Sequence, residues 1–101
     1  MKLVVTARAE IDFERLITFS RSKFGQAVAD RTLDRIFHFL EHVLLPYPRT
    51  GPFDPILELH ACWIPKTPFV VFYRIDYARE SLVIVAMLHH AQDRTSIDLG
   101  D

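Results

Sequence analysis

The chain has 101 residues, and its composition of one half hydrophobic and one quarter charged residues is typical of a globular protein. Twelve Lys and Arg face thirteen Asp and Glu, and the resulting net charge of −1 argues against direct DNA binding, which usually needs a basic excess. A single cysteine excludes an internal disulfide, and no apolar run is long enough for an export signal or a membrane helix. We therefore expect a single domain over residues 1–101 that is cytoplasmic and has no membrane contact.

Two amphipathic helices are predicted after a short first strand. The β-branched pair within residues 2–6 favours a strand, and Thr6 can then cap a helix. One mainly apolar stripe at helical spacing consists of Phe13, Leu16, Ile17, Ser20 and Phe24. A second stripe consists of Ala29, Leu33, Ile36, Phe37, Leu40 and Leu44. Only Gly25 and its neighbours separate the two patterns, so we expect an antiparallel helical hairpin.

Three strands are predicted after a proline-rich irregular connection. Residues 56–63 alternate as in a half-buried strand, residues 69–75 (FVVFYRI) are apolar on both faces, and residues 81–88 are again continuously apolar. Strands in series favour antiparallel pairing. The fold class is therefore α+β, with the order β-α-α-β-β-β and a helical hairpin packed on a mainly antiparallel twisted sheet.

Several stretches resemble the RelE/ParE superfamily of bacterial toxins, and the ParE branch in particular. They are SRSKFG at 20–25, AVADRTLDRIFHFLE at 27–41, PYPRTG at 46–51, FVVFYRI at 69–75 and VIVAMLHHAQD at 83–93. Their order and spacing, more than any one motif, carry the resemblance. Gln92 stands where the family often has Arg, and Arg94 lies two residues further on.

The resemblance implies the toxin of a type II toxin–antitoxin module, neutralised by a cognate antitoxin of the ribbon-helix-helix kind. The ParE branch is associated with inhibition of DNA gyrase by protein–protein contact, and the RelE branch with ribosome-dependent cleavage of mRNA. A third alternative is an inactive or regulatory member that only binds antitoxin. We favour the first, non-enzymatic alternative, because a RelE-like site needs a cluster of cations that this sequence lacks.

No metal or other cofactor is expected. His89 and His90 would point to opposite faces if they continue the last strand, so they cannot both ligate one ion, and Cys62 is alone. If the chain were a nuclease, its catalytic groups would come from His89, Arg74, Arg94 and Glu58. Otherwise no catalytic residue is expected, and the candidates for facing a target are Arg74, His89, His90 and Arg94.

Some apolar residues fall outside both helical stripes. A helical hairpin with one face on a sheet could use them to form a groove for an antitoxin helix. The candidate antitoxin-binding residues are Ile11, Phe19, Val28 and Val43.

Overall fold

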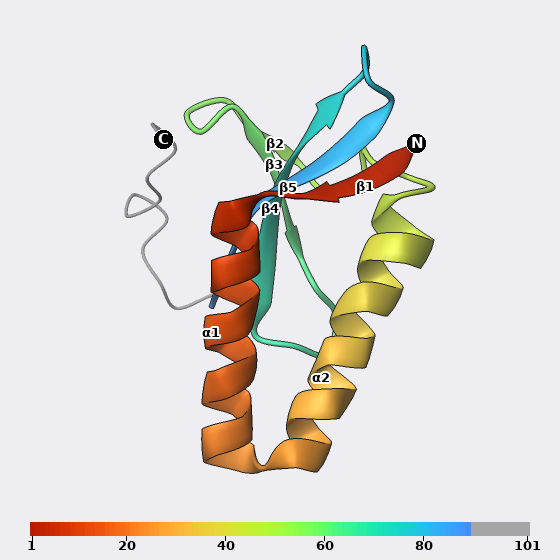
Figure 1. Ribbon diagram of the computed structural model, residues 1–101. Helices are drawn as coiled ribbons and strands as arrows, with labels where there is room; N and C mark the ends of the chain where they lie inside the picture. The colour runs from red at the N-terminus through yellow and green to blue at the C-terminus, as the bar shows by residue number, and fades with distance from the viewer. Residues whose placement is uncertain (90–101) are drawn as a thin grey trace.

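The computed structural model describes residues 1–89, which form a helical hairpin on one face of a five-stranded sheet (Figure 1). The elements in chain order are β1 (Lys2–Val5), α1 (Ala7–Phe24), α2 (Gln26–Phe39), the π-helix η1 (Leu40–Leu44), β2 (Phe53–Asp54), β3 (Leu59–Trp63), β4 (Phe69–Asp76) and β5 (Ser81–His89). The sheet order is β1-β5-β4-β3-β2, in which only the β1–β5 pair is parallel. The predicted α+β class and the order of its main elements are confirmed. None of the helices in residues 1–89 is both long and apolar enough to span a membrane.

The main departure from the expected elements lies in residues 53–58. The sequence predicts a strand from residue 56, but β3 begins only at Leu59, and a two-residue strand, β2, precedes it. The Asp54 carboxylate accepts hydrogen bonds from the backbone N–H groups of Ile56 (2.9 Å) and Leu57 (3.3 Å), and so closes a tight turn. Glu58 follows with a positive φ of 56°. The alternation of apolar residues in this segment therefore belongs to a turn, and the prediction was wrong there.

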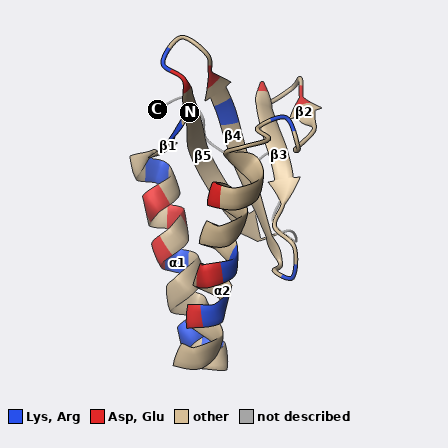
Figure 2. Cartoon of the chain, turned by 90° about the vertical axis from the view of Figure 1, so that its right-hand side faces the viewer, with Lys and Arg blue, Asp and Glu red and all other residues tan. Residues whose placement is uncertain are grey.

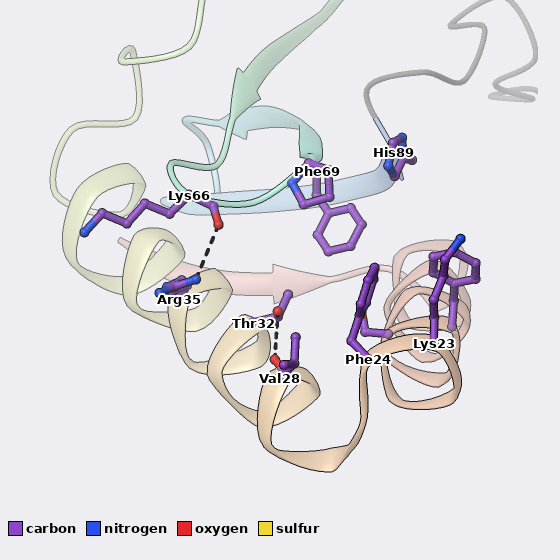
Figure 3. Close-up of a pocket in the computed structure, with 11 residues that line it drawn as sticks. Lys23, Phe24, Val28, Thr32, Arg35, Lys66, Phe69 and His89 are labelled. Carbon is purple, nitrogen blue, oxygen red and sulfur yellow. Dashed lines mark hydrogen bonds between the residues drawn. The ribbon is translucent and has the colours of Figure 1, made fainter.

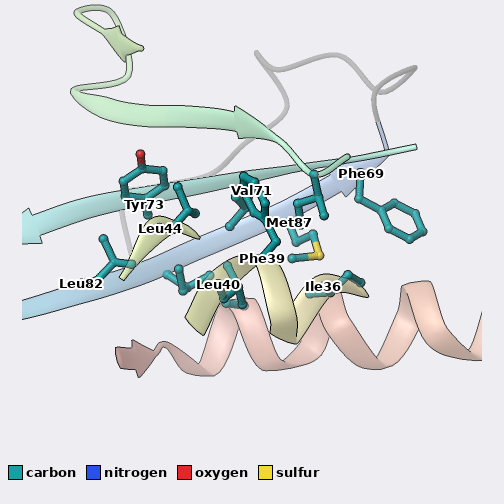
Figure 4. Close-up of a cluster of buried hydrophobic side chains, with 12 residues drawn as sticks. Ile36, Phe39, Leu40, Leu44, Phe69, Val71, Tyr73, Leu82 and Met87 are labelled. Carbon is teal, nitrogen blue, oxygen red and sulfur yellow. The ribbon is translucent and has the colours of Figure 1, made fainter. Parts of the chain in front are cut away.

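The main core lies between the hairpin and the sheet (Figure 4). Ile36, Leu40 and Leu44 project from α2 and η1 and are completely buried, as the predicted stripe requires. They pack against alternate residues of the two longest strands, including Val71, Tyr73, Leu82, Ile84 and Met87. Intervening residues of these two strands form a second buried cluster on the opposite face together with two residues of β3; the cluster consists of Leu59, Ala61, Val70, Phe72, Ala86 and Leu88. The strands are thus apolar on both faces, as predicted for residues 69–75.

Beyond the end of β1, helix α1 lies along the same edge of β5. β1 pairs with β5 only as far as Val5 opposite Ile84. Thr6 then caps α1 by accepting a hydrogen bond from the Ala9 N–H (3.2 Å), while its own hydroxyl lies 3.0 Å from the Ile84 carbonyl. One and a half turns later, the buried Asp12 carboxylate accepts a hydrogen bond from the Met87 N–H at 3.0 Å. The Ile84 carbonyl also accepts from the Thr6 backbone N–H (3.1 Å), whereas the Met87 N–H, beyond the end of β1, has the Asp12 side chain as its partner.

The proline-rich connection is attached to the sheet through Tyr73. Its buried hydroxyl donates to the Pro48 carbonyl (2.7 Å) and accepts from the Gly51 N–H (3.0 Å). The Tyr73 hydroxyl is protonated at neutral pH and can donate, and burial raises its pKa further above the ordinary value for tyrosine. His60 stacks on the same ring, with centroids 5.2 Å apart, and its Nδ1 lies 2.8 Å from the Gly51 carbonyl. A Cβ at position 51 would come within 2.8 Å of the Tyr73 hydroxyl, so the close approach requires glycine.

We expect Asp12→Ala to lower the free energy of unfolding by about 1–3 kcal/mol, because the buried Met87 N–H would lose its partner. Urea unfolding followed by circular dichroism measures this change. Glu14→Ala is the matched control, since it removes an exposed carboxylate from the same helix. A loss below about 0.5 kcal/mol for Asp12→Ala, the size of an ordinary surface effect, would contradict the role of Asp12.

Tyr73→Phe should also cost about 1–3 kcal/mol, since it deletes one hydroxyl and leaves the buried Gly51 N–H and the Pro48 carbonyl without it. Tyr77→Phe removes the same atom from a ring that is 62% exposed, where the hydroxyl accepts hydrogen bonds from the exposed Arg49, and should change stability by less than about 0.5 kcal/mol. The same urea titration compares the two variants. Equal effects from both would show that the connection does not depend on Tyr73.

Candidate functional site

A cavity of about 390 Å³ opens where the hairpin turn extends past the end of the β4–β5 pair (Figure 3). The last turns of α1 and the first turns of α2 form one wall. The segment between β3 and β4 and the end of β5 form the other. The lining residues are Phe19, Ser20, Lys23, Phe24, Val28, Thr32, Arg35, Lys66, Pro68, Phe69 and His89.

A second cavity of about 500 Å³ continues along α2 toward η1. It shares Arg35 and Lys66 with the first cavity, and the Arg35 guanidinium lies 3.5 Å from the Lys66 carbonyl at the point where the two meet. Its other lining residues are Asp34, His38, Phe39, Val43 and Pro65. We call the two cavities together the hairpin groove.

The groove is apolar in its walls and mainly cationic at its rim. Phe19 and Phe24 are 51% and 58% exposed, which is unusual for such large apolar side chains. Lys23 lies over the Phe19 ring, with its Nζ 5.5 Å from the centroid. Lys23, Arg35 and Lys66 line the first cavity, which has no Asp or Glu among its lining residues, and Asp34 is the carboxylate of the second. Figure 2 shows how the charged residues of α1 and α2 lie along the two helices. Such a groove suits an apolar segment that carries negative charge.

The four residues predicted to bind an antitoxin lie in different places. Phe19 and Val28 come from different helices and line the first cavity together. Val43 lines the second cavity. Ile11 is 47% exposed on α1 and lines neither. Three of the four candidates thus share the hairpin groove.

The residues predicted for a nuclease site are not brought together. His89 lines the hairpin groove on the helix side of the sheet, where its ring and that of Phe69 form a T-shaped pair with centroids 6.1 Å apart. Arg74 alternates with the buried Tyr73, so it lies on the opposite face, and it pairs with Val83 in the register, six residues before His89. Six residues of strand correspond to about 20 Å. Glu58 is exposed in the turn before β3. Arg74 approaches Asp76 at 3.9 Å, a loose surface ion pair rather than part of a cleft.

The remaining two target-facing candidates, His90 and Arg94, lie outside the described residues. Cys62 offers no activated nucleophile, because burial raises the pKa of its thiol. Among residues 1–89 no three His, Cys, Asp or Glu side chains are grouped so that they could hold a metal ion.

Several groove residues were missed from the sequence. Lys23, Arg35 and Lys66 are separated by twelve and thirty-one positions, and nothing in a linear pattern places them on one rim. Phe24 was assigned to the core stripe of the first helix, but it is exposed in the groove because α1 extends beyond the sheet. The one sequence signal for its exposure was its position at the end of the stripe, next to Gly25.

Comparison with known proteins identifies the family. The family model described as "ParE toxin of type II toxin-antitoxin system, parDE" matches residues 3–94. In structure, the chain is similar to one from the chromosomal ParDE TA system of P. aeruginosa, with a TM-score of 0.72 and 16% identity over 88% of this chain and 95% of that one. No curated protein sequence matches it. The family match spans nearly the whole sequence and agrees with the helical hairpin on its sheet, and the chain belongs to the ParE toxin family of type II toxin–antitoxin systems.

Proposed function

We propose that this protein is the toxin of a two-protein module and that a cognate antitoxin neutralises it by filling the hairpin groove. The observation that carries the proposal is an apolar groove with a rim of three cations in a chain of the ParE toxin family. An acidic amphipathic segment fits both properties, since its apolar side would cover Phe19, Val28 and Phe69 while its carboxylates meet the cations. A ribbon-helix-helix protein encoded beside this one is the expected source of that segment.

DNA gyrase is the proposed target, reached by protein–protein contact in the cytoplasm. Cleavage of mRNA would need a base, an acid and cations around one phosphate. Glu58, Arg74 and His89 are divided between two faces and two ends of the sheet, and this arrangement supports a non-enzymatic toxin instead. The near-neutral charge of the chain supports the same choice, because it offers little for neutralising the phosphates of ribosomal RNA.

Phe19→Asp should weaken binding of the antitoxin encoded by the adjacent reading frame by about 30-fold, or about 2 kcal/mol, because the apolar wall would carry a charge that repels an acidic segment. Ile11→Asp places the same charge on an equally exposed position of α1 outside the groove, and should change the dissociation constant less than about threefold. Calorimetric titration of antitoxin into each variant gives both values. Equal losses of affinity for the two variants would show that the antitoxin binds another surface.

The antitoxin-free protein should inhibit DNA supercoiling by purified gyrase and increase the amount of cleaved DNA held by the enzyme, and added antitoxin should reverse both effects. Agarose gels of relaxed plasmid incubated with gyrase and ATP measure them. Growth after induction without antitoxin is the parallel test in cells, and it should stop. Codon-phased cuts in mRNA on translating ribosomes would favour a RelE-like nuclease, and normal growth would favour an inactive, antitoxin-binding member.

A further inference from the structure

Two histidines contact one another on the exposed side of the second helix. His38 lies in the last turn of α2 and His42 in η1, four residues later. Their ring centroids are 4.7 Å apart and the ring planes are inclined by 37°. Both side chains are exposed. Their contact within residues 1–89 is the one between the two rings.

The local backbone favours this alignment. In an α-helix, four residues slightly exceed one turn of 3.6, so a residue at i+4 is rotated away from residue i. The π-helix at Leu40–Leu44 has a wider turn, shown by the hydrogen bond from the Leu45 N–H to the Leu40 carbonyl, five residues back, at 2.9 Å. A wider turn reduces the rotation between His38 and His42. Single-turn π-helices are rare and often occur at functional sites.

We propose that His38 and His42 form a chelating pair for a divalent transition-metal ion of the Ni²⁺, Cu²⁺ and Zn²⁺ group. Two histidines four residues apart on one helix face are a known zinc-binding arrangement, and imidazole nitrogen suits all three ions. Each ring contributes one nitrogen, and water fills the remaining positions. The expectation that no metal binds was formed without the H-x-x-x-H spacing that His38 and His42 supply. His38 also lines the second cavity of the hairpin groove, but the argument for the metal site does not rest on the proposed toxin function.

The neighbouring carboxylates do not complete the site. Asp34 lies one turn before His38 and lines the same cavity, but it is eight residues, or about 12 Å of helix, from His42. Glu41 is adjacent to His42 in sequence, and consecutive residues of a helix point in different directions. The described residues thus supply two ligands and no third. Affinity should follow the usual order for such sites, with Cu²⁺ bound most tightly.

The test is titration of the tag-free full chain with ZnCl₂, NiCl₂ and CuCl₂ at neutral pH, followed by calorimetry. We expect one ion per chain, tightest for Cu²⁺. His38→Gln and His42→Gln should each weaken binding at least about tenfold. Asp34→Asn is the matched control, because it removes a carboxylate that lies one turn before His38 and lines the same cavity, and it should change the affinity less than about threefold. Melting curves without metal verify that each variant is folded, and His38→Ala and His42→Ala replace any glutamine variant that is not.

Ring-nitrogen NMR identifies the ligands directly, since the ¹⁵N shifts of His38 and His42 should move together on addition of Zn²⁺. The proposal is overturned if no ion binds, or if both histidine variants bind as tightly as the original chain, which would place the metal elsewhere. It is also overturned if Asp34→Asn and His38→Gln abolish binding while His42→Gln does not, because the chelate would then be Asp34 with His38.

Discussion

The hydrogen bond between the Asp12 carboxylate and the Met87 backbone N–H is the constraint on which the arrangement of the two layers depends. Together with the Thr6 cap, it holds α1 along the part of β5 that β1 leaves uncovered. A buried N–H without a partner is costly, so the helix cannot slide along the strand without breaking this bond. Its position determines how far α1 extends past the sheet, and so places Phe19 in the same cavity as His89.

The groove is formed by two separate parts of the chain rather than by one element. The hairpin supplies Phe19, Val28 and the two cations of its helices, and the segment between β3 and β4 supplies Lys66 and the wall opposite. The bond from Arg35 to the Lys66 carbonyl joins the two sides where the cavities meet. The fold tolerates the exposed aromatic rings of this surface, because the buried core beneath α2 does not include them. Such a surface is suited to a partner, and neutralisation by an antitoxin would cover it.

The candidate site could be anticipated only in part. Phe19, Val28 and Val43 were identified because they fall outside the helical stripes, and a groove beside those stripes is where the structure places them. Ile11 satisfied the same criterion and lies elsewhere, since the pattern cannot tell which side of a helix faces the groove and which faces solvent. A search for apolar periodicity could not find Asp12, because it is a charged residue that is buried with a hydrogen bond from the Met87 N–H and an ion pair with Arg8.

The sequence by itself determined the order of the elements, the helical hairpin at Gly25, the apolar strands and the resemblance to ParE, because periodicity, capping and motif order are local properties of the chain. The tertiary structure alone decided the strand order, the turn at residues 53–58 and the separation of Arg74 from His89. Strand pairing and the choice of sheet face depend on contacts between residues that are far apart in sequence. A one-residue change of register moves a side chain to the other face of the sheet, and the register cannot be read from a local sequence pattern.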